Sequence, residues 1–277
     1  MIGKIRRLAR LLLDYCRNVD FRRYVGNAPA HESGRRWADR ANNDLPTEPS
    51  TPADPTGALF VYFQRRSQGR GIQKWTQYFD AYERHLGRFI GRPVALAEIG
   101  IFSGGSLEMW SAYFGEGLSL YGVDIAPETK VYENARTRIF IGDQGDPAFW
   151  ARFNAEVKGL DVLIDDGSHL PEHQISTFEE MFPRLNPGGV FLCEDVHGER
   201  NPFSAYVAGL SDRLHAYHPT AMDGDFKHGV ESMATNVQSM IASVHIYPFL
   251  VVIEKRRASL PRLQAPRHGS EWQAYYK

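Results

Sequence analysis

Cysteine is scarce in this sequence, and long apolar runs are missing. Cys16 and Cys193 are the only cysteines among 277 residues, too few for a disulfide framework or a cysteine-rich zinc site, and we therefore expect a cytoplasmic protein. No run of about 18 apolar residues occurs, so no membrane span is expected. Near the N-terminus the apolar run covers only Leu11 to Leu13, which is too short for a signal peptide.

An excess of one charge is also absent. Lys and Arg number 32 and Asp and Glu 33, which gives a formal net charge of −1. This balance argues against a dedicated nucleic-acid-binding protein, which usually carries a basic excess. Hydrophobic residues at 43% and charged residues at 23% are typical of a globular protein and exclude a chain that is disordered throughout or collagen-like.

The N-terminal region is basic. Residues 1–25 hold seven basic and two acidic residues, with Ile5, Leu8, Leu12 and Tyr15 at helical spacing, which predicts an amphipathic helix. This helix could dock on a membrane surface or a partner. It could instead bury its apolar face on its own domain or on a second copy, and the second copy would make a homo-oligomer.

A proline-rich stretch follows. Residues 26–58 contain five prolines and many Ser, Thr, Asn and Asp residues, which predicts a linker or a mobile lid. The chain is thus divided into an N-terminal region, residues 1–58, and a main domain, residues 59–277.

From residue 72 onward, strand patterns alternate with helical patterns. The alternation predicts an α/β fold with a Rossmann-like, mostly parallel seven-stranded sheet and helices on both faces. The last two strands, residues 241–247 and 249–254, are separated only by Pro248, which predicts a closing antiparallel pair. Parallel strands are expected at residues 94–99, 118–123, 139–141, 160–164 and 190–193, and helices at residues 72–90, 104–114, 172–185 and 203–215.

Acidic residues lie at or just past the carboxyl end of each predicted parallel strand. In open α/β sheets the ligand binds outside these strand ends. Acids at all five ends therefore predict a ligand site at this rim of the sheet. They are Glu98, Asp124, Asp143, Asp165 with Asp166, and Glu194 with Asp195.

A glycine-rich turn, EIGIFSGGS at residues 98–106, follows the first strand. Its glycines let the backbone approach a ligand in front of a helix. The spacing is not the G-x-G-x-x-G of dinucleotide-binding proteins, and no P-loop lysine follows. Glu98 suits an amine, and Asp124 is placed to bind both ribose hydroxyls. Asp143 and Gln144 could contact an exocyclic amine such as that of adenine, so the set suits a nucleoside with a cationic amino-acid tail.

The segment from Glu98 to Gln144 resembles the class I S-adenosylmethionine-dependent methyltransferases, which have an acidic-Gly-x-Gly-like turn and an acid that ends the second strand. Residues 101–103 here replace the usual second glycine. The resemblance implies S-adenosyl-L-methionine as the cofactor. The residues expected to bind it are Lys74, Glu98, Gly100, Ser103, Gly104, Ser106, Asp124, Asp143, Gln144 and Asp165.

A second polar set ends the fourth and fifth strands, with DDGSH at residues 165–169 and EDVH at residues 194–197. Neighbouring strand ends would bring Asp166, Glu194 and Asp195 into one pocket, where three carboxylates repel unless a divalent ion neutralises them. Oxygen ligands suit Mg²⁺ better than Zn²⁺. The sequence therefore predicts a magnesium site.

Histidines accompany these carboxylates. His169 is the candidate catalytic general base, because a neutral imidazole near a metal can remove a proton from a bound hydroxyl. His173 lies four residues further on, but no third His or Cys ligand is well placed for zinc. His197 either supports Asp195 or binds substrate, and the sequence leaves both open.

The two strings, with Asp143-Gln144 before them, also resemble a narrower group over residues 72–255. It contains the metal-dependent sugar O-methyltransferases of macrolide pathways, the mycobacterial methylmannose-polysaccharide O-methyltransferases and the cephalosporin hydroxylase family. The resemblance implies base catalysis by His169 and a role in capping the cofactor for Lys74. It implies metal ligation by Asp166, Glu194 and Asp195. The remaining candidates, for substrate binding, are Tyr78, His197 and, in a long polar connection at residues 217–236, His228.

These expectations converge on one activity. It is S-adenosylmethionine- and Mg²⁺-dependent methylation of a sugar hydroxyl, on a glycoside, an oligosaccharide or a glycosylated natural product. A catechol-like aromatic diol would need the same metal chelation and remains an alternative acceptor. An NAD(P)-dependent oxidoreductase is a further alternative, but this sequence lacks the G-x-G-x-x-G motif of such enzymes. A scaffold protein without activity would leave the carboxylate cluster unexplained.

Overall fold

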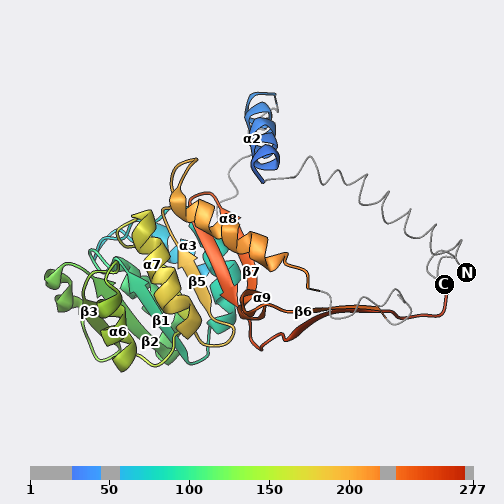
Figure 1. Ribbon diagram of the computed structural model, residues 1–277. Coiled ribbons are helices and arrows are strands. Elements are labelled where there is room, and N and C mark those ends of the chain that lie inside the picture. The colour runs from blue at the N-terminus through green and yellow to red at the C-terminus, as the bar shows by residue number, and fades with distance from the viewer. Residues whose placement is uncertain (1–26, 45–56, 219–228, 272–277) are drawn as a thin grey trace, which may run out of the picture. The chain divides into compact units, whose positions relative to one another are not determined.

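The computed structural model describes residues 27–44, 57–218 and 229–271 (Figure 1). The predicted helix of residues 1–25 and the predicted substrate residue His228 lie outside them. Within the described ranges, no helix combines the length and the apolar character that a membrane span requires.

The chain divides into two compact units, the first made of residues 1–54 and 268–277 and the second of residues 55–267. Within the first unit, α2 (Asn27–Asp44) is helical, although no helix was predicted within the proline-rich stretch. Pro29 lies in the first turn, where a helix tolerates proline. The rest of α2 lacks proline and is rich in alanine and arginine, which are good helix formers.

The second unit is built on a seven-stranded sheet. Its strands are β1 (Val94–Ile99), β2 (Leu118–Asp124), β3 (Thr137–Ile141), β4 (Val162–Asp165), β5 (Val190–Cys193), β7 (Ile241–Tyr247) and β8 (Leu250–Lys255). Their order is β3-β2-β1-β4-β5-β8-β7, with β1 to β5 parallel, β8 antiparallel to β5 and β7 antiparallel to β8. The predicted sheet is confirmed, and its order reverses between β1 and β4, where such sheets bind ligands.

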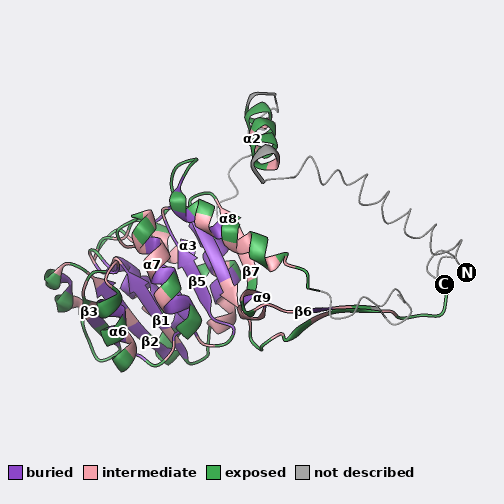
Figure 2. Cartoon of the chain, viewed as in Figure 1, coloured by how far each residue is buried: buried purple, intermediate pink, exposed green. Residues whose placement is uncertain are grey.

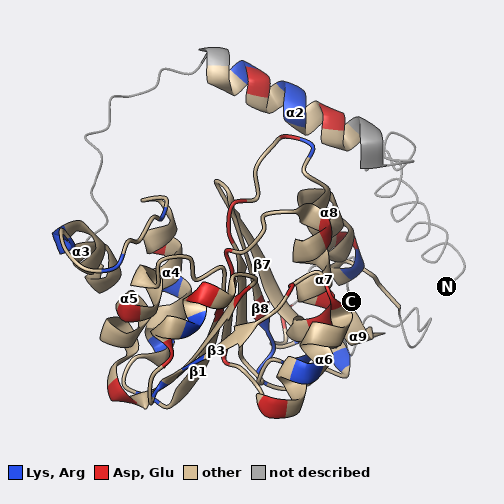
Figure 3. Cartoon of the chain, turned by 90° about the vertical axis from the view of Figure 1, so that its left-hand side faces the viewer, with Lys and Arg blue, Asp and Glu red and all other residues tan. Residues whose placement is uncertain are grey.

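Helices cover both faces of this sheet. They are α3 (Ala58–Arg65), α4 (Tyr78–Leu86), α5 (Gly105–Phe114), α6 (Pro147–Glu156), α7 (Pro171–Met181), α8 (Pro202–Leu214) and α9 (Asn236–Met240). Figure 3 shows α3, α4 and α5 on one side of the sheet and α6, α7 and α8 on the other. Trp110 of α5 is buried in one core and Trp150 of α6 in the other, and the strands between them are buried (Figure 2).

The segment in front of α4 departs from the helix predicted over residues 72–90. The helix begins only at Tyr78, so the prediction is wrong for residues 72–77. This segment follows Gly71, whose carbonyl accepts a hydrogen bond from the amide of Gly105 at 3.1 Å. A Cβ on Gly105 would overlap that carbonyl. The backbone in front of residues 72–77 therefore packs closely on the glycine-rich turn, and these residues do not continue the helix.

A separate two-stranded sheet lies at the C-terminal side of the second unit. Strand β6 (Gly229–Met233) pairs antiparallel with β9 (Arg262–Pro266). Glu231 accepts hydrogen bonds from Arg262 at 3.0 Å and Gln264 at 2.7 Å, and such cross-strand pairs stabilise a sheet. Part of the predicted polar connection is therefore a strand.

Candidate active site

A cavity of about 940 Å³ opens at the carboxyl ends of the parallel strands. Loops after β1 to β5 and the segment in front of α4 form its wall. The predicted site residues that line it are Lys74, Tyr78, Gly100, Ser103, Ser106, Asp124, Asp143, Gln144, Asp166, His169, Glu194 and Asp195. The lining does not include the predicted residues Glu98, Gly104, Asp165 and His197.

The glycine-rich turn after β1 is shaped by two contacts. Gly100 has a φ of 80°, and a Cβ there would overlap the carbonyl oxygen of Asp166. At the end of β2, Oδ2 of Asp124 accepts hydrogen bonds from the amides of Ile101 at 3.0 Å and Phe102 at 3.1 Å. The carboxylate that was predicted to bind ribose thus fixes the backbone that faces the cavity.

Lys74 lies at the centre of the predicted carboxylates. Its Nζ is 2.6 Å from Oδ2 of Asp166, 3.0 Å from Oε2 of Glu194 and 3.3 Å from Oε1 of Glu98. Burial acts to lower the pKa of Lys74, but attraction by these three carboxylates raises it well above its usual value. The ammonium is therefore charged, and it neutralises part of the cluster from the inner side.

Glu98 and Glu194 face this inner side. Glu98 is buried, and its Oε2 accepts a hydrogen bond from Oγ of Ser106 at 2.6 Å. Glu194 is buried too, and its Oε1 accepts from the hydroxyl of Tyr82 at 2.6 Å. Burial raises the pKa of Glu194 to about 8, against the opposing effect of Lys74. Both oxygens of Glu194 are thus bound by protein groups.

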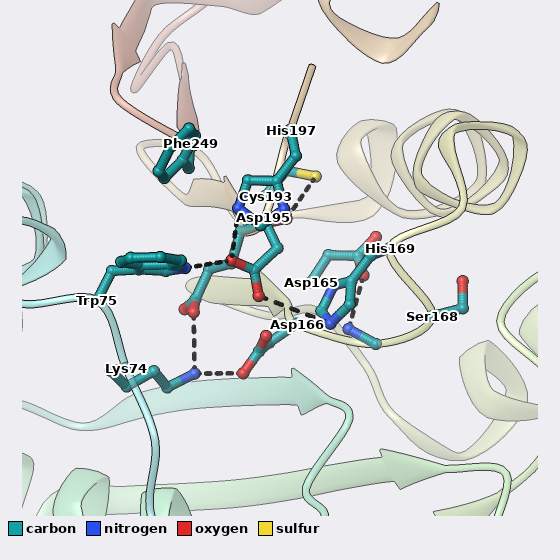
Figure 4. A network of polar contacts seen from close by, with 12 residues as sticks. Lys74, Trp75, Asp165, Asp166, Ser168, His169, Cys193, Asp195, His197 and Phe249 are labelled. Atoms are coloured by element: carbon teal, nitrogen blue, oxygen red, sulfur yellow. Dashed lines mark hydrogen bonds and ion pairs between the residues drawn. The ribbon is translucent and has the colours of Figure 1, made fainter. Parts of the chain in front are cut away.

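A second cluster faces the rim. One ligand atom each from Asp166, His169 and Asp195 lie within 4.8 Å of one another, and Nε2 of His169 is 3.6 Å from Oδ2 of Asp195. In Figure 4 the imidazole of His169 and the indole of Trp75 approach Asp195 from different sides. The structure therefore brings Asp166, His169 and Asp195 together, whereas Glu194 lies on the side of Lys74.

Backbone strain accompanies this rim cluster. His169 has a φ of 58° and Asp195 a φ of 54°, in the left-handed region that non-glycine residues seldom adopt. Such conformations persist where the surrounding structure holds them and gather at functional sites. Tyr78 and Trp75 help to hold Asp195, because the Tyr78 hydroxyl accepts from the Asp195 amide at 3.1 Å and Nε1 of Trp75 donates to Oδ1 at 2.8 Å.

Asp165 and Gln144 link the loops after β3 and β4. Nε2 of Gln144 donates to Oδ1 of Asp165 at 2.9 Å, and its Oε1 accepts from the amide of Ser168 at 2.7 Å. Burial raises the pKa of Asp165 to about 6. Both side chains are buried and position the Ser168 loop, and Gln144 also lines the cavity, as does the half-exposed Asp143.

The other two histidines of the predicted site, His173 and His197, have different neighbours. His173 lies near Ser168, with Nδ1 3.0 Å from its Oγ, and not with the rim cluster. His197 is beside Asp195, with Nε2 3.4 Å from Oδ1. Its ring also lies 4.5 Å from that of Phe249, centroid to centroid. This phenylalanine was missed because the sequence gave it only as the first residue of the last predicted strand.

Sequence comparison identifies the domain type. Residues 97–196 match the model of a protein family described as "Methyltransferase domain". The chain is 34% identical over 211 residues to 8-demethyl-8-alpha-L-rhamnosyl tetracenomycin-C 2'-O-methyltransferase of Streptomyces olivaceus, covering 68% of this chain and 53% of that protein. It is 37% identical over 199 residues to mycinamicin VI 2''-O-methyltransferase of Micromonospora griseorubida, covering 64% and 47%.

Structure comparison agrees. The MycE methyltransferase from the mycinamycin biosynthetic pathway, solved in complex with Mg and SAH, superposes with a TM-score of 0.57 at 25% sequence identity, over 72% of this chain and 54% of that one. The predicted resemblance to class I methyltransferases that act on sugars is therefore confirmed. The chain spans about half the length of the curated relatives it matches.

Proposed function

We propose that this chain, which contains a class I methyltransferase domain, transfers a methyl group from S-adenosylmethionine to a sugar hydroxyl with the help of Mg²⁺. The observation that carries the proposal is the rim cluster of Asp166, His169 and Asp195 at the wall of the cavity. The names of the relatives, which methylate rhamnosyl and macrolide substrates, support a sugar acceptor over a catechol.

The two ligands divide the cavity between them. The cofactor takes the part lined by the glycine-rich turn, Asp124 and Asp143, with Lys74 and the buried Glu98 beneath it. Asp166 and Asp195 would hold the metal, because they offer the hard oxygen ligands that Mg²⁺ prefers. The MycE structure that contains Mg and SAH supports both ligands.

The chain's own groups prepare the acceptor. When bound, Mg²⁺ supplies charge that lowers the pKa of a coordinated hydroxyl. The imidazole of His169, which lies beside Asp195 with Nε2 3.6 Å from Oδ2, takes the hydroxyl proton. The freed oxygen displaces the sulfonium sulfur at the methyl carbon, so the C–O bond forms as the C–S bond breaks. Most of the acceleration comes from alignment of the two substrates.

Location and assembly belong to the same proposal. A cytoplasmic protein is supported by the scarcity of cysteine, and the balanced charge supports a small-molecule or oligosaccharide acceptor over nucleic acid. Self-association through residues 1–25 rests on their amphipathic pattern alone.

Transfer of label tests the proposal. The full chain is incubated with methyl-labelled S-adenosylmethionine, Mg²⁺ and a panel of rhamnosides, other deoxysugar glycosides and catechols. Label should pass to at least one glycoside and stop in chelator. Label in catechols alone, or in no acceptor, would show that the proposed function is wrong.

A further inference from the structure

Three aromatic side chains meet beside the rim cluster, and we call them the aromatic corner: Trp75, His197 and Phe249. The centroid of the Trp75 ring lies 5.3 Å from that of Phe249 and 6.0 Å from that of His197, and the last two are 4.5 Å apart. The rings are inclined to one another by 55° to 83°. They therefore form an open corner and not a slot between parallel rings (Figure 4).

The corner faces outward. Trp75 is 47% exposed and Phe249 is 39% exposed, and the side chain of His197 is 48% exposed. Large aromatic side chains gain stability mainly from burial, so three neighbouring rings left half open contribute little to the core. Of the three, Trp75 lines the cavity, and an exposed aromatic cluster beside a cavity wall indicates a binding surface.

Phe249 occupies its place at a conformational cost. It forms the two-residue turn between β7 and β8 with Pro248, since Tyr247 pairs with Leu250, and its φ is 64°. Glycine or asparagine normally fills a turn position with positive φ. The turn is held from outside, because the Phe249 carbonyl accepts hydrogen bonds from the Tyr78 hydroxyl at 2.9 Å and the Val196 amide at 3.0 Å.

The corner is joined directly to the rim cluster. Nε1 of Trp75 donates to Oδ1 of Asp195 at 2.8 Å, and Trp75 lines the same cavity as Asp166 and His169. A molecule whose hydroxyls reach Asp195 would therefore lie against the indole ring.

We propose that the aromatic corner binds the sugar ring of the acceptor, with the C–H groups of one sugar face against Trp75 and Phe249 and the hydroxyl edge turned toward Asp195. A pyranose ring has C–H groups on one face, which can lie against the indole and phenyl rings, and hydroxyls at its edge, which can reach Asp195. The nitrogen atoms of His197 can hydrogen-bond a further hydroxyl. This inference rests on the proposed function and names the part of the site that selects its substrate class.

The strained turn provides a sharp test. Phe249→Gly removes the ring and relieves the positive φ, so the variant should fold with an unchanged or higher Tm. With methyl α-L-rhamnopyranoside as acceptor, saturating S-adenosylmethionine and Mg²⁺, its KM should rise about tenfold, the equivalent of about 1.4 kcal/mol. Its kcat should stay within about threefold, because the groups that carry out the transfer are intact. The matched control is Ile246→Ala, which trims a 72% exposed side chain of the same hairpin and should leave KM unchanged.

Each outcome of this experiment either supports or overturns the proposed role of the aromatic corner. A wild-type KM in Phe249→Gly, with active wild-type enzyme, overturns the sugar-binding corner and leaves the proposed function standing. A fall in Tm together with weaker cofactor binding would show that Phe249 is structural and also overturns the inference. If the wild-type chain transfers no label to any glycoside of the panel, the proposed function fails first, and the corner fails with it.

Discussion

Nζ of Lys74 lies 2.6 Å from Oδ2 of Asp166, so the chain places its own cation against a carboxylate predicted to hold Mg²⁺. Lys74 and Mg²⁺ would then share one group of acids, the ammonium from the inner side and the metal from the cavity. Lys74 bridges Glu98, in β1 just before the glycine-rich turn, and Glu194, directly after β5.

Removal of that ammonium should cost stability. Lys74→Met leaves Glu98, Asp166 and Glu194 facing one another without it, and loss of one partner from a buried ion pair costs about 3–5 kcal/mol. Thermal unfolding should show a lowered Tm, and Mg²⁺ should restore more of it than in the wild type. Lys158→Met, at an exposed lysine, serves as the control. If Lys74→Met and the wild type had the same Tm in metal-free buffer, the predicted stabilising role of Lys74 would be contradicted.

Removal of Mg²⁺ by a chelator and loss of the Asp166 carboxylate should both stop methyl transfer. Chelator should abolish methyl transfer in the wild type, and added Mg²⁺ should restore it. Asp166→Asn should be inactive as well and should resist rescue at Mg²⁺ concentrations that saturate the wild type, because it lacks a charged metal ligand. Label transfer measured across a Mg²⁺ titration checks this. Full activity of the variant in chelator would place the metal, or the chemistry, elsewhere.

His169 should matter for turnover and not for cofactor binding. His169→Ala should lower kcat by ~10²–10⁴, the usual contribution of a general base, while calorimetry shows unchanged S-adenosylmethionine affinity. His245→Ala provides the comparison, since this imidazole contacts His85 and not the rim cluster. An active His169→Ala enzyme would mean that another group takes the proton.

Asp124 should be required for the cofactor. Its carboxylate accepts hydrogen bonds from the amides of Ile101, Phe102 and Ala126. Asp124→Ala should weaken S-adenosylmethionine binding by about 1.5–3 kcal/mol, the range for a lost hydrogen bond to a charged group. Ser119→Ala, at an exposed position of the same strand, should bind normally in the same calorimeter. Equal affinities for the two variants would remove Asp124 from the site.

Glu254, on β8, should make the fold sensitive to acid. Hydrogen bonding by His85 at 2.8 Å, aided by Arg88 at 3.0 Å, lowers the pKa of Glu254 to about 2. A lowered carboxyl pKa gives stability that is complete above the unfolded value of 4.5 and is lost as pH falls toward 2, about 1–3 kcal/mol in all. Urea unfolding at pH 3 and pH 7 should therefore differ less in Glu254→Gln than in the wild type. The same pH difference in both proteins would exclude this ion pair as the cause.

Much of the fold was predictable because its signals are local. Apolar runs that end in acids predicted the five parallel strands. The single residue Pro248 between the last two predicted strands predicted that they pair antiparallel, and the structure confirms it. Helix α6 was missed although its start is legible, with Pro147 at the first position and Asp146 accepting a hydrogen bond from the amide of Ala148. Residues 72–77 could not be predicted, because close packing on Gly105 decides their path.

The site was predictable in composition and less so in orientation. Glu194 and Asp195 follow β5 directly, and the left-handed φ of Asp195, 54°, means that strand alternation does not give the direction of its side chain. Which of them would face the cavity rim depends on Lys74 and Tyr82, more than 100 residues earlier, which bind Glu194 on the inner side. The meeting of Trp75 with Phe249 likewise depends on the sheet order.

The missing side chain at Gly100 has a consequence for the order of events in solution. A Cβ at Gly100 would overlap the carbonyl of Asp166, and the amide of Asp166 donates to the carbonyl of Ile99 at 3.1 Å. The turn proposed to receive the nucleoside and the loop that carries Asp166, a proposed metal ligand, therefore cannot shift independently. Occupancy of either site then alters the other, and linkage requires the effect to be equal in both directions. Cation affinity in this protein should accordingly depend on whether the methyl donor is already in place.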